Sequence, residues 1–255
     1  ALAAHNLQRA AEARGVRYRF NAAVTAIRQA GGRVQGVTLA SGEQLDAPIV
    51  VNVAGPHSFI INRLAGVEAG MAIKTRALRH EVHLVPAPPG FDFEHAGTHV
   101  SDGDTGIYLR PEAGNTILVG SGDPACDPKE WVDDPDHFDR QVSEAQWKAQ
   151  VYRLAKRLPT LGIPNEKKGL VDLYDVADDW IPIYDKSDLA GFYLAVGTSG
   201  NQFKNAGPVG HLLAELIERC EAGHDHDAQP LTVTGRYTGL RLDLGAFSRR
   251  RAVNR

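Results

Sequence analysis

Residues 192–219 constrain the fold more than any other part of the chain. An apolar run at 192–196 is followed by the small residues of a GTSG turn at 197–200, and then by a helical pattern from about residue 208. A strand, a glycine-rich turn and a helix in that order place backbone N–H groups at the helix N-terminus, where they can bind an anion. The order predicts an α/β layer in which this turn lies at the end of a buried strand.

A second apolar run supports the same layer. Residues 49–51 are all β-branched, and the run stops at Gly55. Continuous apolar strands are typical of parallel sheets that are covered on both faces by helices. Helical spacing over residues 2–14 and a hairpin pattern over residues 24–39 predict the remaining elements of this part.

The middle of the chain has a different pattern. Residues 78–86, 105–110 and 116–120 alternate or form short apolar runs between Pro and Gly, which is typical of antiparallel strands. A long helical pattern follows at 134–158. These segments predict a mainly antiparallel sheet with one accompanying helix.

Together the patterns predict an α/β fold, α+β overall. Residues 1–70 and 169–255 are expected to form one α/β unit, and residues 71–168 to be inserted into it as the antiparallel sheet. Since length alone favours one or two domains, this division agrees with the chain of 255 residues.

Composition excludes several classes of protein. The chain has 28 Lys+Arg and 31 Asp+Glu, a net charge of −3, with 23% charged and 43% hydrophobic residues. This balance argues against disorder and against a dedicated nucleic-acid-binding protein. A compact monomer of its mass, 27.6 kDa, is expected to expose roughly 11,000 Å².

Neither the cysteines nor the hydropathy point to secretion or to a membrane. Cys126 and Cys220 are far apart in the sequence, so no disulfide framework and no paired-cysteine metal site is indicated. No apolar run approaches the roughly 18–20 residues of a membrane span, and the first residues do not resemble a signal peptide. We expect a cytoplasmic protein with no membrane span and no nucleic-acid partner.

Two histidine motifs invite comparison with a metal site. His80 and His83 are three residues apart on an alternating strand, so their rings point to opposite faces, whereas the helical metalloprotease motif needs a spacing of four. His224 and His226 are flanked by aspartates, but a solvated polar loop explains them better. We predict no metal site.

The segment at 197–210, GTSGNQFKNAGPVG, has more than one interpretation. Small residues at a strand end let the backbone approach a ligand, and Lys204 adds a cation beside them. An ordinary strand–helix connection with a solvated lysine explains the same residues, and spacing alone leaves both open. A phosphate- or nucleotide-binding module that uses only this turn is a third interpretation. Tyr108 and Tyr174 lie in strand-like sequence, where partial burial is the default.

Four segments in collinear order resemble the D-amino-acid-oxidase-like family of FAD-dependent oxidoreductases, in particular its sarcosine oxidase and dimethylglycine dehydrogenase branch. Residues 24–58 resemble the family's second FAD segment, and residues 78–82 its entry to the substrate domain. Residues 106–123 resemble the sheet over the flavin, and the 197–210 segment is similar to the late flavin motif. The resemblance implies that the α/β unit is a partial, Rossmann-like FAD-binding domain and that the inserted sheet is the substrate-binding domain.

The resemblance implies FAD as the cofactor and suggests its contacts. Val24 corresponds to a position whose backbone contacts adenine, and Ala54 and Gly55 correspond to the turn beside the ribose and pyrophosphate. The cysteine that holds FAD covalently in monomeric sarcosine oxidases corresponds to Asp172, so the implied FAD is non-covalent. The residues expected along the flavin are Gly200, Asn201, Gln202, Phe203 and Lys204.

The same resemblance implies a small amine or amino acid as the substrate. The equivalent of Lys204 holds the substrate carboxylate, and Tyr108 and Tyr174 correspond to aromatic residues that line the amine pocket. Hydride transfer from the carbon beside nitrogen needs a fixed orientation, which such contacts supply. A lysine that promotes oxygen reactivity in those oxidases corresponds to Leu118, and a pocket histidine to Gly122, so oxidase and dehydrogenase activities both stay open.

One element of the family has no counterpart in the sequence. No GxGxxG, the fingerprint whose helix N-terminus holds the pyrophosphate, occurs in the 255 residues. We therefore expect the C-terminal part of a flavin-dependent oxidoreductase, with weak or no FAD binding on its own. A missing N-terminal FAD-binding segment or a partner chain would complete the site. The alternative is a non-catalytic partner chain or assembly subunit of a split flavoenzyme, and an oligomer is compatible with either.

Overall fold

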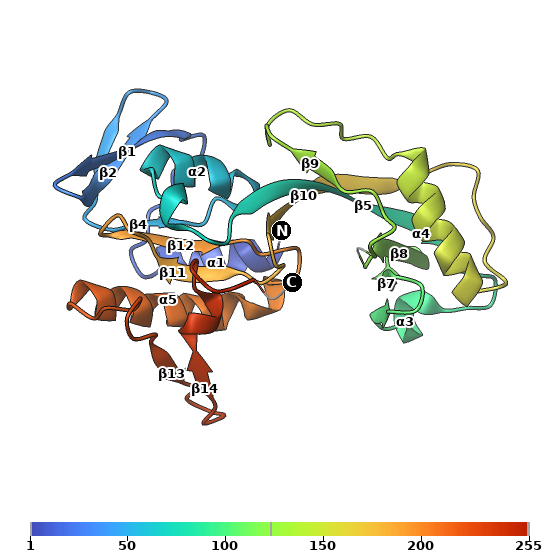
Figure 1. Cartoon of the computed structure of the whole chain (residues 1–255). Coiled ribbons are helices and arrows are strands. Elements are labelled where there is room, and N and C mark those ends of the chain that lie inside the picture. The colour runs from blue at the N-terminus through green and yellow to red at the C-terminus, as the bar shows by residue number, and fades with distance from the viewer. Residues whose placement is uncertain (1, 123, 254–255) are drawn as a thin grey trace.

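The computed structural model describes residues 2–122 and 124–253. In Figure 1 the elements form two groups, and two long antiparallel neighbours, β5 (Thr75–Pro86) and β10 (Gly169–Ala177), run between them. The group on the left contains residues from both ends of the chain, and the group on the right contains the residues between β5 and β10. The chain is a mixed α/β fold with several antiparallel sheets, as the sequence predicts.

The first group is centred on a three-stranded sheet in the order β11-β12-β4. β12 (Phe192–Val196) is parallel to β4 (Val50–Asn52) and antiparallel to β11 (Ile183–Lys186). In Figure 1, α5 (Ala206–Glu221) lies below this sheet and α2 (Ser58–Ala65) lies above it. The described residues also form four short 3₁₀ helices: η1 (Gly55–His57), η2 (Glu68–Gly70), η3 (Phe203–Asn205) and η4 (Leu244–Phe247).

Burial on both faces explains the continuous apolar run of β12. Phe192, Leu194 and Val196 are fully buried in the core on the α2 side, whereas Tyr193 packs on the α5 side with Leu216. Burial of one such side chain stabilises the fold by about 1.5–3 kcal/mol. The strand is therefore fixed between two layers, and the turn that follows it leaves the sheet at a defined place.

A separate antiparallel sheet precedes α2 in the chain. It consists of β1 (Val24–Ala30), β2 (Arg33–Leu39) and β3 (Gln44–Asp46). Gly31 and Gly32 connect the first two strands with φ of 56° and 74°, a conformation that glycine adopts without steric cost. The hairpin that the sequence predicts at this place is confirmed.

The second group is a six-stranded antiparallel sheet in the order β10-β5-β8-β7-β6, with β9 paired to β5. The helix α4 (Glu144–Arg157) covers one face, where Trp147, Val151 and Leu154 are buried, and the short α3 (Phe93–Ala96) packs against β7 and β8. The division of the chain into domains at residues 70 and 168 stays a prediction. The remaining strands are β6 (Val100–Asp102), β7 (Ile107–Glu112), β8 (Thr116–Ser121) and β9 (Glu130–Val132).

The helix α4 is shorter than the sequence pattern predicts. Residues 134–143 form a turn, bends and irregular backbone instead of helix, because Asp134 and Asp139 accept hydrogen bonds from backbone N–H groups two residues ahead. Short polar side chains that bond to their own backbone compete with helix formation. Ser143 then caps the helix by accepting the N–H of Gln146 (3.2 Å), so α4 begins only after it.

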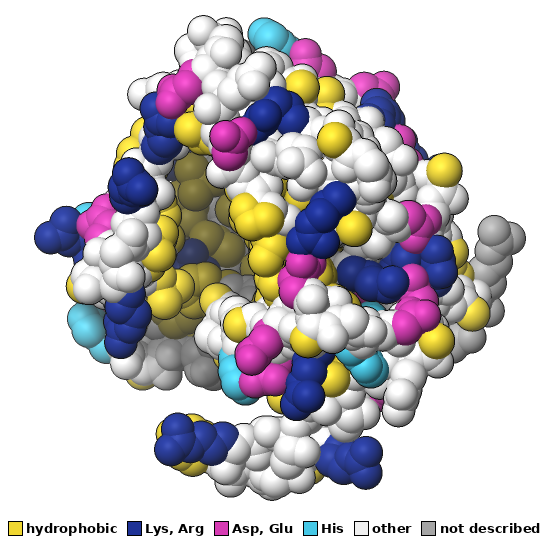
Figure 2. All heavy atoms as spheres, turned by 90° about the vertical axis from the view of Figure 1, so that its left-hand side faces the viewer, with side chains coloured by type: hydrophobic (Ala, Val, Ile, Leu, Met, Phe, Trp, Pro, Cys, Tyr) yellow, Lys and Arg dark blue, Asp and Glu magenta, His cyan; other side chains and the backbone are white. Residues whose placement is uncertain are grey.

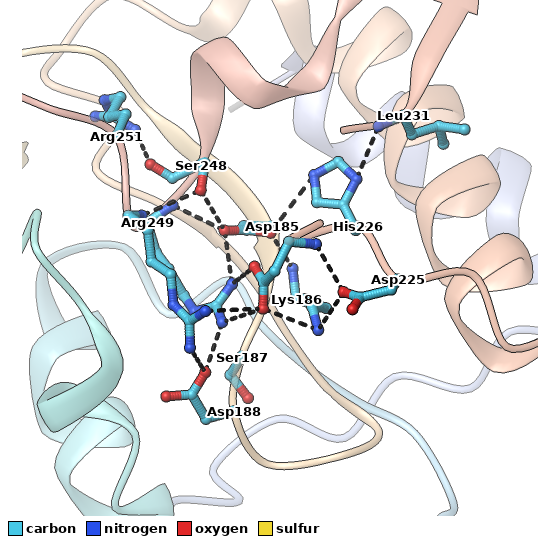
Figure 3. Close-up of polar contacts among 12 residues, drawn as sticks. Asp185, Lys186, Ser187, Asp188, Asp225, His226, Leu231, Ser248, Arg249 and Arg251 are labelled. Atoms are coloured by element: carbon cyan, nitrogen blue, oxygen red, sulfur yellow. Dashed lines mark hydrogen bonds and ion pairs between the residues drawn. The ribbon is translucent and has the colours of Figure 1, made fainter. Parts of the chain in front are cut away.

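A buried ion cluster anchors the C-terminal segment to β11 (Figure 3). This segment follows the small hairpin of β13 (Thr232–Thr234) and β14 (Arg241–Asp243). Arg249 is 0% exposed, and its guanidinium donates to the carboxylates of Asp185 (3.0 Å) and Asp227 (2.8 and 2.9 Å). Opposite charges at these distances keep the segment on the body of the protein.

The prediction of a solvated loop around His226 is wrong, because His226 is buried beside this cluster. The residue is 2% exposed, and its Nδ1 accepts the N–H of Leu231 at 3.0 Å. Burial lowers the pKa of His226, although Asp185, 3.7 Å from its Nε2, opposes that effect. The prediction was wrong because Asp227, the next residue, pairs with Arg249 and draws the loop onto β11.

The chain exposes more surface than a compact monomer does. Its accessible area is 14851 Å², against the roughly 11,000 Å² expected from its mass. No residue of α1 (Leu2–Glu12) is buried, and Leu2 and Leu7 are 74% and 58% exposed. Figure 2 shows the side that lies on the left in Figure 1, where hydrophobic side chains line a hollow. Within the described ranges, no helix has both the length and the hydropathy of a bilayer-spanning segment.

Candidate active site

The face of the six-stranded sheet opposite α4 carries two tyrosines. Tyr108 on β7 is directly opposite Gly120 on β8, which is in turn opposite Val82 on β5. Tyr174 on β10 is opposite Leu78, four residues before Val82 on the same strand. Because paired residues share a face and side chains alternate along a strand, this register places both tyrosines on one face.

His80 and His83 lie on opposite faces, as their spacing predicts. The His80 ring stacks on Tyr174 with 4.2 Å between ring centroids. On the α4 side, His83 Nδ1 lies 2.8 Å from Gln150 Oε1, and the ring meets Trp147 edge to face. Among the residues that the structure describes, no group of three or more His, Cys, Asp or Glu side chains is placed to hold a metal ion.

A pocket of about 860 Å³ opens beside the two tyrosines. Its lining comes from the six-stranded sheet, from the loops that flank it and from the glycine-rich turn after β12. Such a volume is in the range of cofactor and small-molecule sites. Six of the site residues predicted from the sequence line it: Tyr108, Tyr174, Gly200, Asn201, Phe203 and Lys204.

The other four predicted residues lie outside this lining. Gln202 is directed toward the protein, where its Oε1 accepts a hydrogen bond from the Tyr184 hydroxyl at 3.0 Å. Val24 begins β1 and packs against the core on the α2 side. Ala54 and Gly55 follow β4 and are half-buried.

Ala54 and Gly55 nevertheless share one edge of the parallel sheet with the turn at 197–200. β4 and β12 run in the same direction, with Asn52 opposite Leu194, so both strands end at this edge. Open α/β sheets bind ligands at the carboxyl ends of their strands. The structure therefore brings together two turns that are more than a hundred residues apart in the sequence.

Two glycines determine how closely the backbone approaches the pocket tyrosines. A Cβ atom at Gly200 would lie 2.3 Å from the Tyr174 ring, and one at Gly120 would lie 2.3 Å from the Tyr108 ring. Gly200 also has φ of 73°, which other residues adopt only at a steric cost. Only glycine therefore fits at Gly200 without moving Tyr174.

The carboxyl of Asp175 supports the same turn. Its Oδ2 accepts the N–H of Gly197 at 2.5 Å, and its backbone oxygen accepts the N–H of Ser199 at 2.7 Å. The residue is 3% exposed. Burial raises the pKa of Asp175 to about 7, although the backbone N–H groups of Gly197 and Thr198 act in the opposite direction.

Three cationic side chains reach the pocket. Lys204 Nζ donates to a backbone carbonyl of the turn at 2.6 Å, and Arg110 pairs with Glu112 at 2.9 Å. Lys129 Nζ lies 4.9 Å from the centre of the Trp180 ring. The part of the lining that the structure describes contains no carboxylate, so the pocket favours a ligand with a negatively charged group.

Sequence reasoning does not find Arg110, Lys129, Trp180 or Asp175. Arg110 carries a usable signal, because it follows Tyr108 by two residues on a strand and shares its face. Trp180 has φ of 62°, a conformation that is unusual for an aromatic residue and that the spacing of residues in the sequence does not predict. The burial of Asp175 likewise depends on elements that are distant in the chain.

Glycine-containing turns at the carboxyl ends of parallel strands, next to an antiparallel sheet that lines a pocket, are typical of α/β proteins that bind nucleotide cofactors. The chain belongs to the DAO family, FAD dependent oxidoreductases, whose model matches residues 1–216. FAD is the cofactor of this family. No curated protein sequence matches the chain.

Solved structures share the fold at low sequence identity. L-proline dehydrogenase from P. horikoshii is 22% identical with a TM-score of 0.61, covering 78% of this chain and 50% of that one. Iminodiacetate oxidase from Chelativorans sp. BNC1 is 19% identical with a TM-score of 0.62, covering 85% and 54%. Glycine oxidase from Geobacillus kaustophilus is 23% identical with a TM-score of 0.55, covering 81% and 50%. The chain thus spans about half the length of these structures.

The described residues fit the flavin end of FAD. The pocket is large enough for a flavin ring, its wall at Gly200 is bare backbone, and its cations suit a ligand with negative charge. The fingerprint that binds pyrophosphate is not in the sequence.

Proposed function

We propose that the chain supplies the substrate-facing part of a FAD-dependent oxidoreductase that oxidises a small secondary or tertiary amine or an amino acid of the sarcosine type. The observation that carries the proposal is the convergence of Tyr108, Tyr174 and Lys204 on one pocket beside the glycine-rich turn. A tyrosine face attracts an alkylammonium group, and a lysine pairs with a carboxylate. N-methyl amino acids carry both groups a few atoms apart.

When bound, FAD supplies the acceptor for a hydride from the carbon next to the substrate nitrogen. Lys204 holds the carboxylate, and the two tyrosines restrict the N-alkyl group, so that this C–H bond keeps one orientation. Gly200, Asn201 and Phe203 are proposed to lie along the flavin. Lys204 acts as a binding group rather than a base, because hydrolysis of the imine product needs no dedicated catalytic residue. Asp172 offers no thiol, so the FAD is proposed to be non-covalent.

Val24, Ala54 and Gly55 are proposed to contact the adenine and ribose side of the cofactor. We further propose that a βαβ unit from outside these 255 residues, in the same polypeptide or in a partner chain, holds the pyrophosphate. β4 is the last strand in the order β11-β12-β4, so one of its edges can pair with a further strand. The large accessible area of 14851 Å² agrees with such an addition.

A non-catalytic partner chain of a split flavoenzyme is the second candidate function. Leu2 and Leu7 of α1, both more than half exposed, favour it because exposed apolar side chains lose contact with water when subunits associate. Native mass spectrometry of the protein from its source separates the two candidates. One polypeptide longer than this chain supports the first, and a stable complex of this chain with a different subunit supports the second.

Anaerobic reduction of the flavin tests the proposed activity. The protein is isolated from its source, and its visible flavin absorbance is followed after addition of sarcosine, dimethylglycine, proline or a D-amino acid. We expect bleaching by at least one of these amines and none by a carboxylic acid that lacks nitrogen. Absence of flavin, or no bleaching by any amine, contradicts the proposal. Reoxidation by oxygen then separates an oxidase from a dehydrogenase.

A further inference from the structure

Asp175 is a buried carboxyl that the proposed mechanism does not use. It lies on β10 directly after Tyr174, which lines the pocket, and before Val176, which is in the core. Carboxylates are rarely buried to 3% exposure without a cation, because loss of hydration disfavours the charged form. The position of Asp175 between the core and a pocket wall therefore calls for a functional explanation.

The hydrogen bonds of Asp175 join the pocket turn to the end of β10. Gly197 N–H donates to Oδ2 at 2.5 Å, and Ser199 N–H donates to the backbone oxygen at 2.7 Å. The Ser199 hydroxyl donates to the Gly197 carbonyl (3.1 Å) and accepts the N–H of Ala177 (3.3 Å), which closes the set. The two residues that follow Ser199, Gly200 and Asn201, form the wall of the pocket.

Burial, and not the polar groups around it, favours the neutral form of Asp175. Ser58 on α2 and Thr75 on β5 have buried hydroxyl oxygens that make no hydrogen bond of ordinary geometry in the described structure. Both hydroxyls are nonetheless close enough to lower the pKa of Asp175, so they favour its ionised form, and burial, the larger effect, favours the neutral one. Polar groups of this kind are costly to bury unless a hydrogen-bond partner is available.

Charged groups on the packed elements are engaged elsewhere. On η1, next to α2, His57 lies 3.0 Å from Asp136, and on β5 the guanidinium of Arg76 lies over the Trp131 ring. On the side of the turn, Lys204 donates to the Asn201 carbonyl. None of the main influences on Asp175 comes from a cationic side chain.

We propose that Asp175 is a positioning residue of the pocket: its neutral carboxyl holds the 197–200 turn against β10 beside Tyr174, and its ionisation loosens that turn. The pKa of Asp175 is about 7 in the folded chain, against the ordinary 3.8. Ionisation above pH 7 therefore shifts the equilibrium from the conformation with a buried Asp175 carboxyl toward any conformation in which water reaches it. The equilibrium constant changes by up to about 1,000-fold. The consequence for ligand binding rests on the proposed function, whereas the coupling of Asp175 to the turn does not.

An amide titration by NMR tests the coupling on the whole chain. The ¹⁵N and ¹H shifts of Gly197, Ser199 and Asn201 are followed from about pH 5 to about pH 9, a range centred on the expected midpoint. The test variant is Asp175→Asn, which keeps the shape and an acceptor oxygen but does not titrate. The control is Asp178→Asn, because Asp178 is exposed and also accepts one backbone N–H, that of Lys74 at 2.8 Å.

We expect all three amides to titrate together with a midpoint near pH 7 in the wild type and in Asp178→Asn, and to be independent of pH in Asp175→Asn. Three results overturn the proposal: no titration of the wild-type amides, the same titration in Asp175→Asn, or titration of Gly197 with no response at Asn201. The wild-type titration alone decides the question if Asp175→Asn does not fold.

Binding of acetate, the simplest carboxylate probe, extends the test to the pocket. We expect wild-type affinity to fall between about pH 6 and about pH 8, and the affinity of Asp175→Asn to stay constant over that range. An equal dependence on pH in both proteins contradicts the positioning role. Absence of acetate binding at every pH counts against the proposed function, and the amide titration then decides on Asp175 by itself.

Discussion

Replacement of Arg249 is expected to cost a large part of the stability of the fold. Its guanidinium is 0% exposed and pairs with Asp185 (3.0 Å) and Asp188 (2.6 Å), both labelled in Figure 3, and with Asp227 (2.8 Å). Arg249→Met keeps the length and the apolar stem of the side chain but leaves the buried carboxylate of Asp185 without this cation. Removal of one partner of a buried ion pair costs about 3–5 kcal/mol, out of a total that is typically about 5–15 kcal/mol.

Arg250→Met is the matched control. Arg250 pairs with the same carboxylates, Asp188 at 2.7 Å and Asp227 at 3.3 Å, but its side chain is 49% exposed. Exposed ion pairs contribute at most about 1 kcal/mol. Urea unfolding followed by tryptophan fluorescence measures the free energy of unfolding of both variants. Equal losses in the two variants, or a loss below about 1 kcal/mol for Arg249→Met, would refute the reasoning.

The pH dependence of that loss supplies an independent check. Burial raises the pKa of Asp227, but pairing with Arg249 and Lys186 outweighs burial and holds the pKa well below its usual range. A depressed carboxyl pKa stabilises the fold above the ordinary value of 3.8, and this contribution is lost as the pH falls further. The difference between wild type and Arg249→Met should therefore narrow below about pH 4. A difference that is constant with pH would show that electrostatics is not its cause.

Two further substitutions test the account of the sheet and the turn. Gly200→Ala places a Cβ 2.3 Å from the Tyr174 ring at φ 73°. We therefore expect thermal unfolding to show a loss of about 2–4 kcal/mol in the free energy of unfolding. The control is Gly207→Ala, at an open helical site in α5, which should be neutral or stabilising in the same assay. Burial raises the pKa of Glu81, but hydrogen bonds from its histidine, serine and arginine neighbours lower it to about 2. Glu81 thus stabilises the fold above pH 4.5, and this contribution decreases as the pH falls toward 2. Glu81→Gln should therefore be less stable than wild type at neutral pH, and its free energy of unfolding should depend less on pH in acid. The same acid dependence in both proteins would contradict this account.

The elements that sequence could predict are those with local signals. The apolar run of β12 and the hairpin around Gly31-Gly32 depend on neighbours within a few residues, and both are present. The sequence pattern predicts a helix from residue 134, whereas α4 begins at Glu144, because helical spacing does not reveal the hydrogen bonds from backbone N–H groups to Asp134 and Asp139. The pairing of β5 with both β8 and β10 depends on contacts across many residues, which periodicity does not encode.

The candidate site divides in the same way. Tyr108, Tyr174 and Lys204 follow from the resemblance to the family, and the register of the sheet explains why the two tyrosines share a face. Sequence cannot reveal Asp175, because its burial is produced by α2, β5 and the turn together. The role of Arg249 has no local signal in the sequence either, since its carboxylate partners lie more than twenty residues away.

The central claim is that the pocket beside Tyr108 and Tyr174 binds a substrate carboxylate through Lys204. The most direct test is the dissociation constant of acetate for wild type and Lys204→Met, read from the visible spectrum of the flavin-loaded enzyme that also contains the proposed βαβ unit. Lys156→Met, an exposed lysine on α4, is the control. Loss of a charge-assisted contact of about 2 kcal/mol predicts about 30-fold weaker binding for Lys204→Met and no change for the control. An unchanged dissociation constant in Lys204→Met would contradict the claim.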